Sequence, residues 1–427
     1  MNIKNKLLFF FKGSFTSKLF GFATFFLFAK AVSLEVFAVY TIFLFTSEIL
    51  SISLTHGFYS YILRNSNKSV REDLFPKTIF IIICTFLIFS ISIYLSRSIF
   101  LEYLPSSYFV IFNSFTLVIT IIFSQSIIKM IYGYLVSNHL AKEHMQISIM
   151  HGFLKLCAAS VIFFVLNISS LNLILYSLLI SNIITLLFCL MLTKNFITLK
   201  FVGFKESMSL IYDASPFMLK MVIGTFGLYL SRVILDGLAT KEELAVYSFY
   251  LMIIFQLNFF INIISQAVIP SIRDNFDKLH VLKLNLNLYL KKYYIFSSAF
   301  LIVIVISSYV ISYTNIDILN VFIREEYLES IWLFPILILA YLISAPRAIY
   351  DVWQYHELMD IKLKLFVISA SNVIAGLIVY PIGYTIGNIY GVAIGYVIIT
   401  CIFTYVSLHL FRNLIRMIEH EKHLHNS

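Results

Sequence analysis

The chain has 427 residues, of which 60% are hydrophobic and only 12% are charged. Soluble globular proteins carry about 25% charged residues, so the composition excludes a water-soluble fold and indicates a chain whose main solvent is lipid. The net charge of +9 comes from basic residues that are scattered rather than clustered, which argues against nucleic-acid binding.

In chain order, the basic and apolar stretch 1–14 is interpreted as a retained cytoplasmic end, because no signal-peptide cleavage pattern follows it. Twelve apolar segments then follow, each long enough to cross the hydrocarbon core as a helix. They lie at 15–33, 37–62, 78–98, 107–131, 147–167, 171–193, 209–235, 244–268, 293–314, 331–352, 365–385 and 389–411. The sequence therefore predicts an all-α polytopic membrane protein with twelve transmembrane helices.

The loops predict the orientation. If the N-terminus is inside, inner segments carry 21 Lys and Arg residues, whereas outer segments carry only Arg97, Lys241 and Arg324. Because positively charged loops stay in the cytoplasm, we expect both termini to be cytoplasmic.

A short phrase recurs in the two halves. "EVFAVY" at 35–40 and "EELAVY" at 242–247 share four letters at matched spacing, and each lies at the outer end of the first helix pair of six. This predicts two six-helix lobes, 1–200 and 201–427, related by a pseudo-two-fold along the membrane normal, with 194–208 between them as a hinge. Chance recurrence in a Tyr-rich chain is the alternative interpretation.

Charged residues inside the spans are functional candidates, because each costs about 2.5–3.5 kcal/mol at mid-helix. Those near a predicted span end can extend to the headgroups: they are Lys18, Lys30, Lys129, Arg232 and Arg347. The deep ones must face protein or water: they are Glu48, Lys155 and Lys220.

Two local patterns extend this reading. Asp213 and Lys220 are seven residues apart and share a helix face, with Pro216 between them as a predicted hinge. Glu48 with Lys220 as a structural ion pair is the alternative. Arg232 with Asp236, and Arg347 with Asp351, have the spacing of pairs on one helix face. The four cysteines, each within an apolar run, predict buried thiols and no metal site.

Three stretches carry a family resemblance: "SKLFGFATFFLFAKAVSLEVFAVY", "DASPFMLKMVIGTFGLYLSRVILDGLATKEELAVYSFY" and "SNVIAGLIVYPIGYTIGNIYGVAIGYVIIT". They resemble the first, seventh, eleventh and twelfth helices of the O-antigen (polysaccharide repeat-unit) flippases of the multidrug/oligosaccharidyl-lipid/polysaccharide exporter superfamily. Ser231 stands where family members often have Asp. Twelve spans rather than fourteen argue against the peptidoglycan-precursor branch.

The resemblance implies a bacterial inner-membrane flippase, without enzymatic activity or cofactor, whose substrate is an undecaprenyl-diphosphate-linked oligosaccharide. A polysaccharide polymerase and a chain-length regulator are implied as partners, beside membrane lipid. The substrate would be held in a cationic cavity by Lys155, Lys220, Arg232, Lys30, Lys129 and Arg347. Glu48 or Asp213 would couple transport to a proton or sodium gradient.

Two alternatives stay open. A multidrug or organic-cation antiporter of the same superfamily should have an acidic cavity, whereas basic residues outnumber acids in these spans. A membrane glycosyltransferase or polysaccharide polymerase needs an outer active site, and the largest outer loop, 314–330, offers little room for one.

Overall fold

The computed structural model describes residues 3–64, 68–103, 114–165, 170–193, 200–257, 279–314, 323–351 and 362–426. Over these ranges the chain is all-helical. The helices are α1 (Ile3–Ala31), α2 (Leu34–Leu54), α3 (Phe58–Arg64), α4 (Lys68–Tyr103), α6 (Phe115–Ser137), α7 (Ala141–Ser160) with the π-turn η1 (Val161–Val165), α8 (Leu171–Thr193), α9 (Phe204–Leu238), α10 (Lys241–Leu257), α12 (Leu279–Tyr313), α14 (Glu325–Glu329), α15 (Leu333–Asp351) and α16 (Lys362–Asn426).

A helix lies at each of the twelve predicted spans, so the prediction of an all-α polytopic membrane protein is confirmed. Seven described helices are long and apolar enough to cross a membrane, and two shorter apolar helices lie in α12 and α15. The continuous α16 covers the last two spans, and its backbone breaks at Gly387 and Asn388, where the sequence predicts the turn between them. The two parts of α16 on either side of this break approach so closely that a Cβ on Gly391 would overlap the Gly383 carbonyl.

The two copies of the repeated phrase both begin a helix. Ser33 caps α2, because its hydroxyl accepts a hydrogen bond from the Val36 N–H at 3.3 Å. Thr240 and Glu243 form a reciprocal capping box at the start of α10, with N–H to side-chain distances of 3.0 and 3.2 Å. The repeated letters therefore mark the same structural place in each half, the corner after the first long helix.

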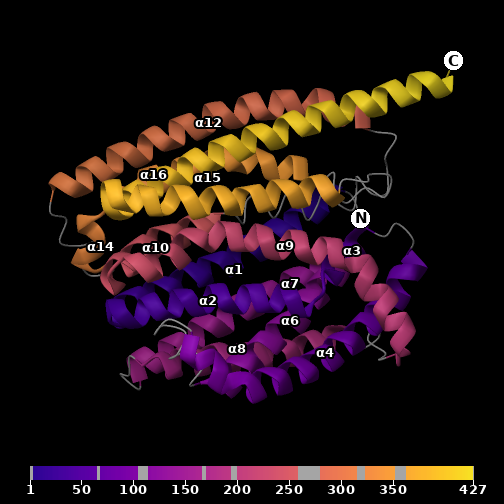
Figure 1. The fold of residues 1–427 in the computed structure, drawn as a ribbon, viewed down its shortest axis with the longest axis horizontal. Helices are drawn as coiled ribbons and strands as arrows, with labels where there is room; N and C mark the ends of the chain where they lie inside the picture. Colours follow the sequence, from indigo (N-terminus) through magenta and orange to yellow (C-terminus); the bar gives the residue numbers. More distant parts are fainter. Residues whose placement is uncertain are drawn as a thin grey trace.

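The corners α1–α2 and α9–α10 lie at one end of the bundle, together with α14, and the chain termini lie toward the other end (Figure 1). The charge distribution predicts the corner end to face outward, and we call it the outer end. This assignment lets depth be measured along each helix from its outer end.

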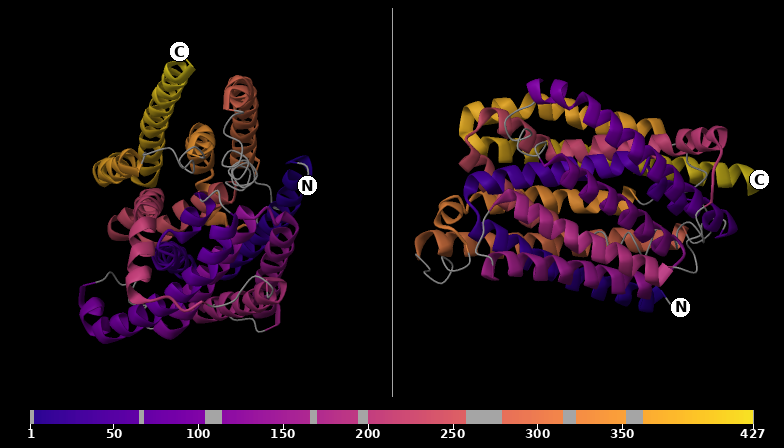
Figure 2. Two further views of the ribbon diagram at one scale, coloured as in Figure 1. Left: turned by 90° about the vertical axis from the view of Figure 1, so that its right-hand side faces the viewer. Right: turned by 90° about the horizontal axis from the view of Figure 1, so that it is seen from below.

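Helix contacts divide the bundle into two groups that follow the chain. In the first, α1 packs on α7, α7 and α6 pack on α8, and α2 and α4 pack on α6. In the second, α9 and α15 pack on α16, and α10 and α12 pack on α15. The end view shows α12, α15 and α16 above the first group, with α9 and α10 between them (Figure 2). A lobe boundary at residue 200 stays a prediction.

The groups meet most extensively where α2 packs on α9 and α10, with further contacts of α1 on α10 and of α3 on α9. At the outer end this junction is aromatic. Tyr327 of α14 stacks on Phe249 of α10 at 4.2 Å between ring centroids and contacts Phe37 of α2 at 6.0 Å. The Tyr250 hydroxyl also donates a hydrogen bond to the Tyr327 carbonyl. The two groups are therefore packed together at the outer end.

Candidate functional site

Four charged residues lie near the middle of the first helix group, on α1, α2, α6 and α7. They are Lys18, Glu48, Lys129 and Lys155, and we call them the central cluster. Lys18, Glu48 and Lys129 are about 13 to 14 residues from the outer ends of their helices, which is about 20 Å along the helix. Lys155 is 14 residues from the inner start of α7, and Lys18, Glu48 and Lys129 are charged groups that act on its ammonium.

Small residues bring the helices of the central cluster together. A Cβ on Gly152 of α7 would lie 2.9 Å from the Ser17 carbonyl oxygen of α1, so only glycine allows this approach. Gly152 is close in sequence to Lys155, and Ser17 precedes Lys18. Close contact between the α1 and α7 backbones therefore places the two ammonium groups near one another.

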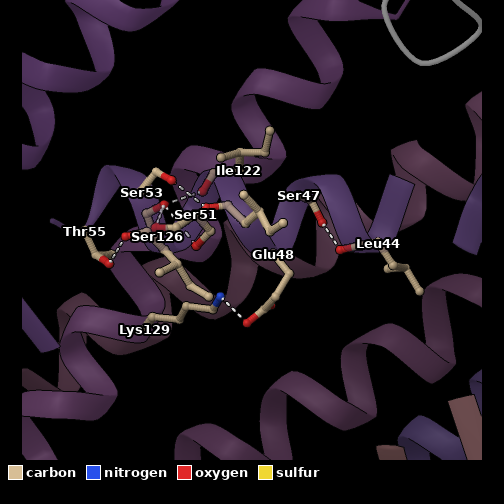
Figure 3. A network of polar contacts seen from close by, with 11 residues as sticks. Leu44, Ser47, Glu48, Ser51, Ser53, Thr55, Ile122, Ser126 and Lys129 are labelled. Carbon is tan, nitrogen blue, oxygen red and sulfur yellow. Dashed lines mark hydrogen bonds and ion pairs between the residues drawn. The ribbon is translucent and has the colours of Figure 1, made fainter. Parts of the chain in front are cut away.

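Hydroxyl groups hold α2 against α6. The Ser126 hydroxyl lies 3.1 Å from the Ser51 hydroxyl and 2.8 Å from the Ile122 carbonyl of its own helix. Glu48 is three residues before Ser51, and Lys129 is three residues after Ser126, so both charges lie one turn away on the same faces. Figure 3 shows Glu48 and Lys129 pointing toward each other beside this serine contact.

Glu48 and Lys129 form an ion pair, with 2.8 Å between Oε1 and Nζ. The sequence alternative paired Glu48 with Lys220 instead. Both side chains are partly accessible, at 40% for Glu48 and 31% for Lys129. Although the charges touch, the Lys129 ammonium makes no hydrogen bond of good geometry within the described residues. The pair is therefore an electrostatic contact that leaves hydrogen-bonding capacity on the ammonium.

Lys18 lies far from the end of its helix, contrary to the sequence prediction. We expected the first span to begin at residue 15, whereas α1 begins at Ile3. The Lys18 ammonium donates a hydrogen bond to Gln256 Oε1 of α10 at 3.0 Å, which connects the two helix groups. Lys129 likewise lies eight residues from the end of α6. Both residues lie well inside their helices, deeper than the positions near span ends that the sequence predicted.

Two polar residues near the central cluster were given no role from the sequence. His151 of α7 lies 3.1 Å from Asn182 Oδ1 of α8, and Lys155 and Lys18 both act on its ring. Gln256 is the partner of Lys18. Nothing in the local sequence distinguishes these residues, because their role depends on which helices pack together.

Arg232 is completely buried, and it is the largest of the fully buried side chains among the described residues. Its side chain is 0% exposed, and none of its three guanidinium nitrogens has a hydrogen-bond partner among the described residues. The guanidinium lies over the rings of Tyr229 at 5.0 Å and Phe255 at 5.4 Å. Cation–π attraction to these two rings partly compensates the cost of burying the guanidinium charge.

The expected pair of Arg232 with Asp236 does not form in this structure. Asp236 instead contacts the Lys241 ammonium at the start of α10, at 2.5 Å. Arg232 therefore remains a buried positive charge without a carboxylate partner among the described residues.

The remaining predicted residues lie elsewhere. Lys30 is at the outer end, where its ammonium is 3.5 Å from the Ile323 carbonyl, and Arg324 Nε donates to the Lys30 carbonyl at 3.2 Å. Asp213 is exposed on α9 and is near the Tyr61 hydroxyl.

Lys220 is half-buried on α9, seven residues beyond Asp213. Pro216 lies between them within a helix that continues on both sides. The side chains of Arg347 and Asp351 lie outside the described set. The structure thus brings Lys129, Lys155 and Glu48 together and adds Lys18 to them.

The arrangement has a clear chemical character. The central cluster holds three ammonium groups and one carboxylate, so it carries an excess of two positive charges. Within the described residues no group of three or more metal-ligating side chains exists. Such a site suits an anion more than a metal ion or an organic cation.

No protein-family model and no curated protein matches the sequence. Solved structures do match the fold. An outward-facing multidrug resistance MATE family transporter of the MOP superfamily has a TM-score of 0.70 and 15% identity, covering 97% of this chain and 95% of its own. A MOP superfamily transporter from Pyrococcus furiosus has 0.69 and 15%, covering 98% and 96%. A mutant Vibrio cholerae MATE transporter has 0.63 and 10%, covering 97% and 96%. The chain therefore has, over nearly its whole length, the fold of MATE transporters of the MOP superfamily.

Proposed function

We propose that the protein is a flippase that moves an undecaprenyl-diphosphate-linked oligosaccharide from the inner to the outer leaflet. The single observation that supports this substrate class is the sign of the central cluster, in which Lys18, Lys129 and Lys155 outnumber Glu48. The fold supports the coarser statement, transport across a membrane.

The charge balance matches the proposed headgroup. A diphosphate that links a lipid to a sugar carries about two negative charges, one on each phosphate. The excess of two positive charges in the central cluster would compensate them in a region where an unpaired ion is expensive. The sugars and the phosphates would pass between the helix groups, while the prenyl tail would stay in lipid.

The driving force in this proposal is an ion gradient. Glu48 is a partly accessible carboxylate at the middle of the bundle, and its partner Lys129 would be contested by an arriving diphosphate. A carboxylate released from its partner can bind a proton or sodium ion. Glu48 is therefore our first choice for ion coupling, ahead of the exposed Asp213.

A multidrug antiporter is the second candidate, because MATE transporters share the fold. Glu48 could then hold an organic cation. Against this reading, the same carboxylate already contacts Lys129, and two further ammonium groups act nearby. Binding-pocket polarity need not be constant in this fold: the Pyrococcus furiosus structure was described as having a pocket of reverse polarity that suggests a different function.

Transport in reconstituted vesicles tests the proposal. We expect the wild-type protein to move a fluorescent undecaprenyl-diphosphate-linked oligosaccharide between leaflets, and Lys155→Gln to reduce the rate at least about tenfold, the loss of one charge-assisted contact. Lys142→Gln is the matched control, because Lys142 is an exposed lysine at the start of the same helix. Transport of a cationic dye without transport of the lipid would overturn the proposal.

A further inference from the structure

The hydrogen bond from Lys18 to Gln256 has an unusual place in the molecule. It joins α1 of the first helix group to α10 of the second at mid-depth, since Gln256 is 15 residues from the outer end of α10. Gly21, one turn after Lys18 on α1, also faces Gln256, with 3.8 Å from an added Cβ to Oε1. This face of α1 therefore lies along the Gln256 side chain.

The bond is one that an anion can replace. Gln256 offers a neutral amide oxygen, whereas a phosphate oxygen is charged, so the exchange turns a bond between a charge and a dipole into a contact between opposite charges. The ammonium also feels Glu48 and, through repulsion, Lys155. A diphosphate placed among these ammonium groups would relieve the repulsion, which a neutral amide cannot do.

We propose that Lys18 is a further headgroup-binding residue, and that its bond to Gln256 is a latch between the helix groups which the bound diphosphate opens. The inference rests on the proposed function and deepens it. Gln256 is a positioning residue: it touches Lys18 and not the headgroup. When a phosphate oxygen of the ligand accepts the hydrogen bond from the Lys18 ammonium, the bond between Lys18 of α1 and Gln256 of α10 is lost. The two helix groups can then separate at this point.

This links substrate binding to the conformational change. A ligand shifts a conformational equilibrium only by its differential affinity for the two states. Here the difference in affinity has a structural source. Lys18 donates its hydrogen bond to Gln256 in the latched state and to the diphosphate in the opened state, so the ligand binds the opened state more tightly. The packing of α2 on α9 and α10, together with the outer aromatic contacts of Tyr327, would then still join the groups.

Distances between spin labels measure the latch directly. In a chain whose four cysteines are replaced, one label pair is placed at Glu35→Cys and Glu242→Cys, both exposed at the outer ends of α2 and α10. A second pair, Lys142→Cys and Ser209→Cys, reports on the inner ends of α7 and α9. The protein is held in nanodiscs, and undecaprenyl diphosphate is the added probe.

Wild type should bind the probe and change its distance distributions. Gln256→Ala should show the changed distributions without probe and bind it at least as tightly. Lys18→Gln, which keeps a donor but removes the charge, should bind about tenfold more weakly and show no probe-dependent change. Gln256→Glu, which nearly preserves shape, should strengthen the latch and also weaken binding about tenfold.

The outcomes separate the two proposals. If wild type does not bind the probe at all, the proposed function fails. If wild type binds and responds, but Gln256→Ala and Gln256→Glu both behave like wild type, the latch is refuted while the function stands. Unchanged probe affinity in Lys18→Gln would equally refute the role of Lys18.

Discussion

Glu48 of α2 and Lys129 of α6 lie in ion-pair contact, 2.8 Å apart, with both side chains partly accessible at the middle of the membrane-spanning bundle. A purely structural pair at this depth would be expected to exclude water and to satisfy its hydrogen bonds. This pair leaves hydrogen-bonding capacity unused, since the Lys129 ammonium lacks a well-oriented acceptor among the described residues, and the Glu48 side chain stays 40% accessible. In this geometry Glu48 binds the Lys129 ammonium, which the substrate's diphosphate would bind in its place.

Removal of the Glu48 charge should therefore favour the anionic ligand. We expect Glu48→Gln to bind undecaprenyl diphosphate about tenfold more tightly, because the competing carboxylate is lost, and to lose transport driven by an ion gradient. Binding is measured by titration in nanodiscs. Glu35→Gln, an exposed carboxylate at the start of the same helix, is the control. Weaker binding by Glu48→Gln would mean that Glu48 supports the ligand rather than competing with it.

Arg232 should contribute to function at the expense of stability. Its buried charge has cation–π contacts but no carboxylate partner among the described residues, and replacement of buried charged groups by apolar side chains of similar size is often neutral or stabilising by about 1–4 kcal/mol. Arg232→Met should accordingly keep or raise the thermal unfolding temperature while transport falls. The two readouts are a thermal melt in detergent and the vesicle assay.

The opposite pattern would identify a structural residue. If Arg232→Met lowers the unfolding temperature and leaves transport intact, the contacts with Tyr229 and Phe255 are the role of Arg232. Leu238→Met, at an exposed site at the end of the same helix, controls for the introduced methionine.

Gly152 should not tolerate a methyl group. Because an added Cβ would lie 2.9 Å from the Ser17 carbonyl, Gly152→Ala must push α1 away from α7, at a cost of about 1–3 kcal/mol. The same shift would move Lys18 away from Lys155 and reduce diphosphate binding. Thermal unfolding and probe titration measure the two effects.

A matched glycine provides the comparison. Gly224 is in the interior of α9 and no atom lies within 4 Å of an added Cβ, so Gly224→Ala should be neutral or stabilise by about 0.4–1 kcal/mol. Equal behaviour of the two variants would show that α1 and α7 are not in tight contact at Gly152.

Tyr327 should hold the outer end closed. Its side chain is 0% exposed and packs on Phe249 and Phe37, so Tyr327→Ala removes a buried aromatic contact worth about 3–5 kcal/mol. In this background a membrane-impermeant maleimide should react faster with a cysteine at Ala38, which is buried near the outer end of α2. Tyr313→Ala, at an exposed site on α12, should leave the rate unchanged. Equal rates in both variants would contradict a closed outer junction at Tyr327.

The helical fold could be predicted from sequence because lipid imposes it: twelve apolar segments of sufficient length have few alternatives to helices. The break at Gly387 and Asn388 was also predictable, since it separates two spans. The start of α1 was not. Basic residues such as Lys12 interrupt its apolar pattern, so the span was placed too late and Lys18 was assigned to an end.

The site was predictable only in part. Lys155 and Glu48 were identified by depth alone, which needs no knowledge of packing. Lys129 was also named for the cavity, but its pairing with Glu48 and the roles of Lys18 and Gln256 required knowing that α1, α2, α6 and α7 meet and that α10 crosses nearby. Pairings also changed, since Asp236 contacts Lys241 rather than Arg232. Such contacts depend on rotation of each helix about its axis, which a repeat of 3.6 residues leaves undetermined.

The sign of the transported headgroup is the central claim, and a paired flux measurement tests it most directly. Vesicles containing the wild-type protein or the triple variant Lys18→Gln, Lys129→Gln, Lys155→Gln are given the lipid-linked oligosaccharide and a cationic dye in parallel. The account predicts that wild type translocates the lipid and not the dye, and that the triple variant translocates neither. Dye flux in wild type, or undiminished lipid flux in the triple variant, would contradict it.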